Sequence, residues 1–240
     1  MRRRAAIALV LVIAGAILAI TAGVVLSDAD SASQGSPPVT RHVPPPSRPA
    51  HAATGRCVSQ AVLARAAAVT RIAKRRYDHE HYGVAVHDAL RRVARDPALV
   101  ADLARGNLSA ALGVANHQLI LHTVRIRIVQ HSQVLVDANP KSFAVGGALG
   151  ELYGLHNRPL GRAEVTVQDV IGFIKLVHKY HPGDVVVRGA SGEVKSSLPG
   201  AAHAQLPSSG CAQVGGHSYV VQSFHRTGFA GERLKIWVLV

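Results

Sequence analysis

Acidic residues are scarce in this sequence, with 14 Asp and Glu against 27 Lys and Arg in 240 residues. The formal net charge is therefore +13. A protein this basic attracts anionic surfaces, among them lipid head groups, wall polymers and nucleic acid. Export, which the N-terminus predicts, makes nucleic acid the least expected of these partners.

Catalytic motifs are also missing. There is no G-x-S-x-G sequence, and the serines and histidines are too numerous for one pair to stand out as nucleophile and base. The cluster of Gly146, Gly147, Gly150 and Gly154 is not followed by an amphipathic helix, which favours a turn or a bulge over a phosphate-binding loop. We therefore predict no catalytic residue, no cofactor and no enzyme activity, with a hydrolase as the least favoured alternative.

The 14 histidines do not form a metal-binding pattern. His79 and His81 are two residues apart and point to different sides of a helix. His178 and His181 converge only if the helix reaches His181, directly before Pro182. Since no cysteine or carboxylate joins either pair at the H-E-x-x-H spacing, we predict no metal site.

The long apolar run of the chain stands at its N-terminus, where "MRRR" is followed by 22 uncharged residues, 5–26. At about 1.5 Å per residue, a helix of this length spans the core of a bilayer. The leading arginines hold its start in the cytoplasm. We expect residues 1–26 to be an uncleaved signal anchor that places the rest of the chain outside the cell membrane. The alternative is a cleaved signal peptide, whose apolar region is usually about 7–15 residues, and a secreted protein.

Residues 27–54 are rich in Pro, Ser and Ala and have no apolar periodicity. Such a segment cannot bury enough apolar surface to offset its ordering entropy, which predicts a disordered linker. Residues 55–240 then form one extracytoplasmic domain of ordinary size. No second apolar span and no output module follow, so we expect any signal to pass through a partner protein.

Two cysteines stand near the ends of this domain, Cys57 and Cys211. An oxidising compartment permits them to form one structural disulfide. Two unpaired buried thiols are the alternative.

The spacing of apolar residues changes along the domain. Residues 57–118 repeat at three and four positions, which predicts helices. From residue 119 the period becomes two, with predicted strands at 121–130, 133–138, 142–145 and 161–167. A hairpin at 184–195 and two final strands at 217–224 and 233–240 complete the pattern. Helices first and a mostly antiparallel sheet with one inserted helix afterwards indicate an α+β fold.

The inserted helix begins in "TVQDVIGFIKLVHKYH", residues 166–181, at a polar joint. The Asp169 carboxylate can accept a backbone N–H in the first turn, and its charge suits the positive end of the helix dipole. An apolar stripe then follows along the helix. A capping role is favoured over a catalytic one.

The succession "TVRIRIVQHSQVLVDANP", a glycine-rich bend and "GRAEVTVQDVIGFIKLVHKY" resembles the extracytoplasmic Cache (PDC-type, PAS-like) sensor domains. The resemblance is to a branch found in actinobacterial membrane-anchored proteins and covers residues 57–240 in element order. It implies a long N-terminal helix packed on an antiparallel sheet, with a small molecule between the sheet and covering loops.

Arg125 and Arg127 point from one face of a predicted strand and could grip a carboxylate, which guanidinium groups favour. Lys175 and His178 share one side of the inserted helix and could add positive charge, as could His156 in a loop. A row of arginines facing solvent on a one-sided sheet is an equal alternative.

The sequence therefore predicts a membrane-tethered, extracytoplasmic domain that binds a small anionic metabolite and signals through a partner. The competing hypothesis is a basic envelope protein that holds an anionic polymer or lipid surface without a ligand pocket.

Overall fold

The computed structural model describes residues 59–120 and 122–240. The predicted anchor, the linker and Cys57 lie outside these residues, so the Cys57–Cys211 disulfide stays a prediction. Within the described part of the chain, no helix combines the length and the apolar character needed to cross a membrane.

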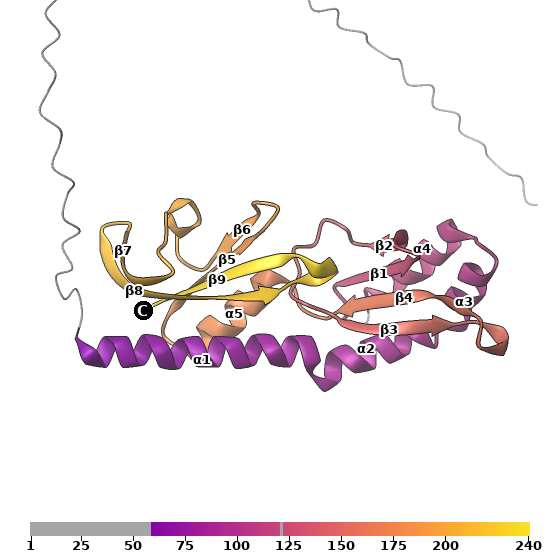
Figure 1. Ribbon diagram of the computed structural model, residues 1–240, viewed down its shortest axis with the longest axis horizontal. Coiled ribbons are helices and arrows are strands. Elements are labelled where there is room, and N and C mark those ends of the chain that lie inside the picture. The colour runs from indigo at the N-terminus through magenta and orange to yellow at the C-terminus, as the bar shows by residue number, and fades with distance from the viewer. Residues whose placement is uncertain (1–58, 121) are drawn as a thin grey trace, which may run out of the picture. The chain divides into compact units, whose positions relative to one another are not determined.

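The described residues begin with four helices, as the sequence predicts (Figure 1). Gly83, with an extended backbone, separates the first two, and the Asp96 carboxylate caps the third by accepting the N–H groups of Ala98 and Leu99. The four are α1 (Gln60–Tyr82), α2 (Val84–Ala94), α3 (Pro97–Ala104) and α4 (Leu108–Gln118).

Residues 122–240 contain nine strands in two antiparallel sheets, where the sequence predicts one sheet. The first sheet has the order β2-β1-β4-β3 and the second the order β6-β5-β9-β8-β7. The α+β class and the antiparallel pairing are confirmed. The helix α5 (Val170–Tyr180) connects the two sheets instead of being inserted into one. The strands are β1 (Arg125–Gln130), β2 (Gln133–Ala138), β3 (Ala148–Tyr153), β4 (Pro159–Thr166), β5 (Asp184–Gly189), β6 (Val194–Ser196), β7 (Ser209–Val214), β8 (His217–Thr227) and β9 (Arg233–Leu239).

Two strands differ from the predicted ones for identifiable reasons. The predicted strand at 142–145 makes only an isolated bridge between Ala144 and Asp169, whereas the glycine-rich bend after it contains β3. Gly150 of β3 is a packing residue, because a Cβ there would lie 2.9 Å from Leu90 Cδ2 of α2. The sequence does not indicate β7, because this strand begins within a loop rich in Pro, Gly and Ser.

The first sheet is covered on one face by α2, α3 and α4. Ile126, Ile128, Ala163 and Val165 alternate onto this face and are fully buried against those helices. The opposite face carries Arg125 and Arg127 and the other charged residues of the sheet.

The second sheet is covered on both faces. Val185, Val187 and Ile236 pack against α1 and α5, and Figure 1 shows α1 running alongside this sheet. Val186 and Trp237 of the same strands point to the other face, where they join a smaller core closed by the loop of residues 198–208. The N-cap of α5 is Asp169, whose carboxylate accepts the Gly172 N–H at 2.6 Å.

The two sheets meet where the turn after β8 contacts the first sheet. The Ala230 N–H donates to both carboxylate oxygens of Glu164, at 2.9 and 3.0 Å. The Arg125 guanidinium lies 4.9 Å from the centre of the Phe229 ring. The Tyr77 hydroxyl of α1 donates to Thr227 O at 2.8 Å and accepts the N–H of Gly146, in the link between β2 and β3, at 3.0 Å.

Candidate functional site

A row of basic side chains crosses the second sheet on the face away from α5. Register pairs Lys235 of β9 with Arg188 of β5 on one side and with His225 of β8 on the other. Val187 and Ile236 face α5. Because side chains alternate along a strand, the three basic residues therefore project from the opposite face.

These residues line a hollow of about 410 Å³, which we call the Trp237 hollow. Nothing in its lining is acidic. Its residues are Arg188, Gly189, Ala190, Gln205, Leu206, His225, Arg233, Lys235 and Trp237.

The Trp237 ring forms an aromatic surface between two cations. Arg188 Cζ lies 5.3 Å and Lys235 Nζ 4.8 Å from the ring centre, within the range of cation–π attraction. The indole N–H donates to Pro207 O at 3.0 Å, and Lys235 Nζ donates to Ser208 Oγ at 3.1 Å. Both hydrogen bonds hold the loop of residues 198–208 against β9, which carries Trp237 and Lys235.

Positive charge in the Trp237 hollow is not neutralised by neighbours. Among the described residues, Arg188, Arg233 and Lys235 form no ion pair with a carboxylate. Glu232, which precedes Arg233 in the chain, accepts the Ser191 hydroxyl at 2.8 Å. Cations gathered without a counter-ion repel one another, and an anion would relieve that repulsion.

A second, larger hollow of about 620 Å³ lies between the end of α1 and the end of the β8–β9 hairpin; we call it the junction hollow. It shares His225 and Arg233 with the Trp237 hollow. Its residues are Tyr77, Asp78, His81, Tyr82, His225, Arg226, Thr227, Gly231 and Arg233.

Polar groups of the junction hollow already bond to one another or to the backbone. Asp78 and Arg226 form a two-bond ion pair with N–O distances of 2.9 and 3.2 Å. Burial raises the pKa of Tyr77 above its usual range, so its hydroxyl stays protonated. Burial also lowers the pKa of His81, partly opposed by the Asp78 carboxylate, which favours the neutral imidazole at pH 7.

The five ligand residues predicted from the sequence do not form one site. Arg125 makes a two-bond ion pair with Asp137, at 2.9 and 2.8 Å, and also donates to Ser142 O. Arg127 lies beside it in β1, with Asp137 and Glu164 as its partners in register on the neighbouring strands. The first sheet's own carboxylates therefore surround the arginine pair.

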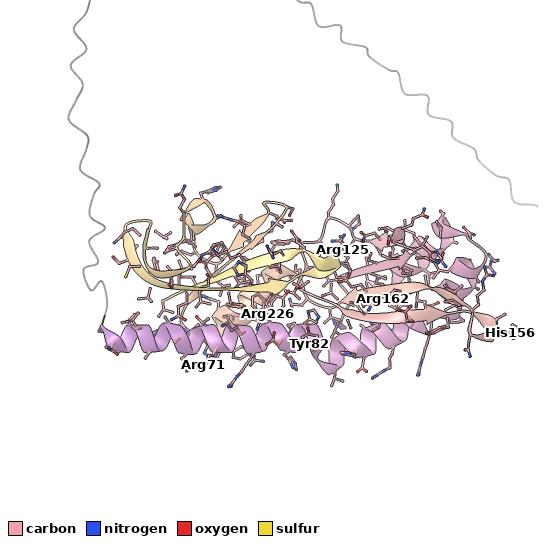
Figure 2. The ribbon with its side chains drawn as sticks, in the orientation of Figure 1. Arg71, Tyr82, Arg125, His156, Arg162 and Arg226 are labelled. Atoms are coloured by element: carbon pink, nitrogen blue, oxygen red, sulfur yellow. The ribbon has the colours of Figure 1, made fainter. Side chains whose placement is uncertain are left out.

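The other three predicted residues lie elsewhere. Figure 2 shows His156 at the far end of the first sheet from Arg125, and His156 is exposed. Lys175 and His178 line a separate hollow of about 270 Å³ beside α5, together with Lys195, Ser196 and Ser197. The distribution of the five residues follows from the two-sheet architecture, which separates β1 from α5.

Sequence reasoning missed Arg188, Lys235 and Trp237. A signal was present in "RLKIWVLV", where both faces of the strand are largely apolar. A strand with two apolar faces is covered on both sides. Lys235 lies on the same face of this strand as Trp237, the face away from α5. Within the described residues, no group of three or more His, Cys, Asp or Glu side chains is placed to hold a metal ion.

Glu164, at the contact between the sheets, gives a pH-dependent prediction. Burial raises its pKa, against the lowering effects of the Ala230 N–H and of Arg127 and Arg125. A carboxyl group whose pKa is higher in the folded state than in the unfolded state stabilises the fold when it is protonated. This stabilisation is complete below the unfolded pKa of about 4.3 and is lost as the pH rises through the folded pKa. As the pH rises from about 4 to about 7, wild type loses this stabilisation and Glu164→Gln does not. The free energy of unfolding of Glu164→Gln should therefore rise relative to that of wild type over this range.

Urea unfolding of both proteins at the two pH values measures this change. Glu151→Gln is the matched control, because Glu151 is exposed on the neighbouring strand. A difference between Glu164→Gln and wild type that does not vary with pH would contradict the assignment.

Comparison with known proteins finds no matching family model and no matching curated protein. Among solved structures, the chain is similar to the ligand-binding domain of the chemoreceptor CtaA from Pseudomonas fluorescens, solved in complex with L-alanine. The sequence identity is 10% and the TM-score is 0.39, and the match covers 72% of this chain and 96% of that one. It is also similar to an extracellular ligand binding receptor from Desulfohalobium retbaense: identity is 11%, coverage is 71% and 39%, and the TM-score is 0.31. The chain thus spans well under half of the second receptor. The resemblance to Cache domains stays a prediction.

Proposed function

We propose that this protein binds a small organic anion in the Trp237 hollow. The observation that carries the proposal is a hollow lined by Arg188, Arg233 and Lys235, which have no carboxylate partner among the described residues. Two of these cations, Arg188 and Lys235, flank the Trp237 ring. The guanidinium groups suit the two oxygens of a carboxylate. Leu206 offers apolar contact for the remainder of the ligand, beside the largely buried Trp237 ring.

The site differs from the one that the sequence suggests. The Arg125 guanidinium is already paired with the Asp137 carboxylate. Among the described residues, the Arg188 and Lys235 side chains contact the Trp237 ring, and Lys235 also donates to the Ser208 hydroxyl. We therefore assign anion binding to the second sheet. Lys175 and His178 remain a separate candidate, with a smaller hollow.

Sensing is the function that we infer from binding. Residues 1–26 would tether the domain to the outer side of the membrane, and occupancy would reach a partner protein. The Trp237 hollow is well placed for this, because the hairpin that carries His225 and Arg233 also contacts α1 through Arg226 and Asp78.

A thermal-shift scan of the full chain in mild detergent, against organic acids and amino acids, tests the proposal. One class of acid should stabilise the protein saturably, by about 2.7 kcal/mol at 100 times its Kd. For a domain of this size, that raises Tm by several degrees, at roughly 2–4 °C per kcal/mol.

Arg188→Gln and Lys235→Gln should each weaken binding of that acid by about tenfold or more, since a hydrogen bond to a charged group contributes about 1.5–3 kcal/mol. Arg71→Gln is the matched control, because Arg71 is exposed on α1 and points away from the hollow (Figure 2). Lys175→Gln tests the candidate beside α5.

Failure of every acid to shift Tm, together with polymer binding that weakens steeply with salt, would favour the envelope-protein hypothesis over the sensor.

A further inference from the structure

The two hollows border the same two residues, His225 and Arg233. We propose that the ligand is an elongated acid: its anionic group lies in the Trp237 hollow, and a ring at its other end lies in the junction hollow. This inference rests on the proposed anion site and specifies the class of molecule that it takes.

An open strand edge connects the two hollows. Pairing between β7 and β8 reaches Gln222, and the Ser223 N–H donates to Ser208 O at 2.8 Å, so among the described strands none pairs with the outer edge of residues 225–227. Val220 and Val240 exchange both backbone hydrogen bonds, which directs the even-numbered residues of β8 toward β9. The N–H groups of His225 and Thr227 therefore point to the open side. A ligand passing from one hollow to the other would meet these two donors.

The junction hollow provides a surface for a ring. Tyr82 is 68% exposed although it is a large aromatic residue at the end of α1. Its ring centre lies 4.0 Å from that of His81, which supports it from behind. Figure 2 shows Tyr82 at this end of α1, near the junction of the two sheets. An exposed aromatic face beside a polar hollow suits the face of a sugar or an aromatic ring.

The difference in charge between the two hollows determines which end of the ligand lies in which hollow. In the junction hollow, Arg226 is neutralised by Asp78 through two hydrogen bonds. The Asp78 carboxylate would also repel a second anionic group. Of the three cations without an ion pair among the described residues, Arg233 lines both hollows, whereas Arg188 and Lys235 line only the Trp237 hollow. The ring end is therefore uncharged, and the acidic end lies beside Trp237.

Two pairs of acids test this inference on the full chain by isothermal titration. Gluconate and cellobionate differ by a neutral sugar ring, and butyrate and 4-phenylbutyrate differ by an aromatic ring. In at least one pair, the ring-extended acid should bind about tenfold or more tightly than the short one, a gain of about 1.4 kcal/mol. The pair that shows the gain identifies the type of ring.

Tyr82→Ala should remove that gain and leave the short acid unaffected, whereas Arg188→Gln should weaken both members of the pair. Tyr180→Ala is the matched control, because Tyr180 is an exposed tyrosine of α5 that lines neither hollow. Equal affinity of short and extended acids, or a gain that survives Tyr82→Ala, would overturn the elongated ligand and leave the anion site intact. Absence of binding by all four acids would overturn the anion site and, with it, this inference.

Discussion

Tyr77→Phe is expected to lower the free energy of unfolding by about 1–3 kcal/mol, although it removes a single oxygen atom. The Tyr77 hydroxyl is fully buried and bonds both to Thr227 O and to the Gly146 N–H. Phenylalanine would leave that N–H and that carbonyl without their partner. Tyr77→Ala should cost about 3–5 kcal/mol, because the contact with the edge of the Phe173 ring is lost as well.

Chemical denaturation of each variant measures these losses. Tyr180→Phe provides the control, since the Tyr180 ring is 51% exposed and its hydroxyl makes no hydrogen bond to another described residue. An effect of Tyr77→Phe no larger than that of Tyr180→Phe would mean that the Tyr77 hydroxyl does not hold α1 to the two sheets.

Gly147→Ala is expected to destabilise the domain by about 1–3 kcal/mol or more, as overpacking does. A Cβ at Gly147 would lie 2.5 Å from Val165 O, a backbone atom of β4 that cannot move without disturbing the sheet. It would also lie 3.2 Å from Cδ2 of Phe229, in the turn that joins the sheets. The close approach of the β2–β3 link to β4 is possible only for glycine.

Gly113→Ala should have the opposite sign. Gly113 lies within α4, and a Cβ there would meet no atom within 4 Å. Alanine in a helix interior is about 1 kcal/mol more favourable than glycine. Thermal unfolding of both variants compares them directly: loss of stability in both, or in neither, would contradict the packing described at Gly147.

Local patterns in the sequence predict the elements well where one face of each is buried. "RIRI", residues 125–128, alternates strictly, and the structure buries Ile126 and Ile128 and places Arg125 and Arg127 on the opposite face. Asp169 before an apolar stripe marks the start of α5. These features depend on residues close together in the chain.

The division into two sheets depends on contacts between residues far apart. In the sequence, Gly150 is typical of a bend. In the structure it lies within a strand, and glycine is needed there because a side chain would collide with Leu90 of α2. Arg188 and Lys235 become neighbours only when β5 pairs with β9. Nothing near either residue in the sequence specifies that pairing, whereas the two arginines of β1 are already two residues apart in the chain.

The fluorescence of Trp237 tests the central claim most directly, because it is the single tryptophan of the chain and forms the floor of the proposed anion site. Titration of the acid that raises Tm should change the emission saturably, with the same Kd as the thermal shift, and Arg188→Gln should move both values together. An acid that raises Tm in wild type and in Arg188→Gln alike, while the Trp237 emission stays constant, would show that anions bind elsewhere.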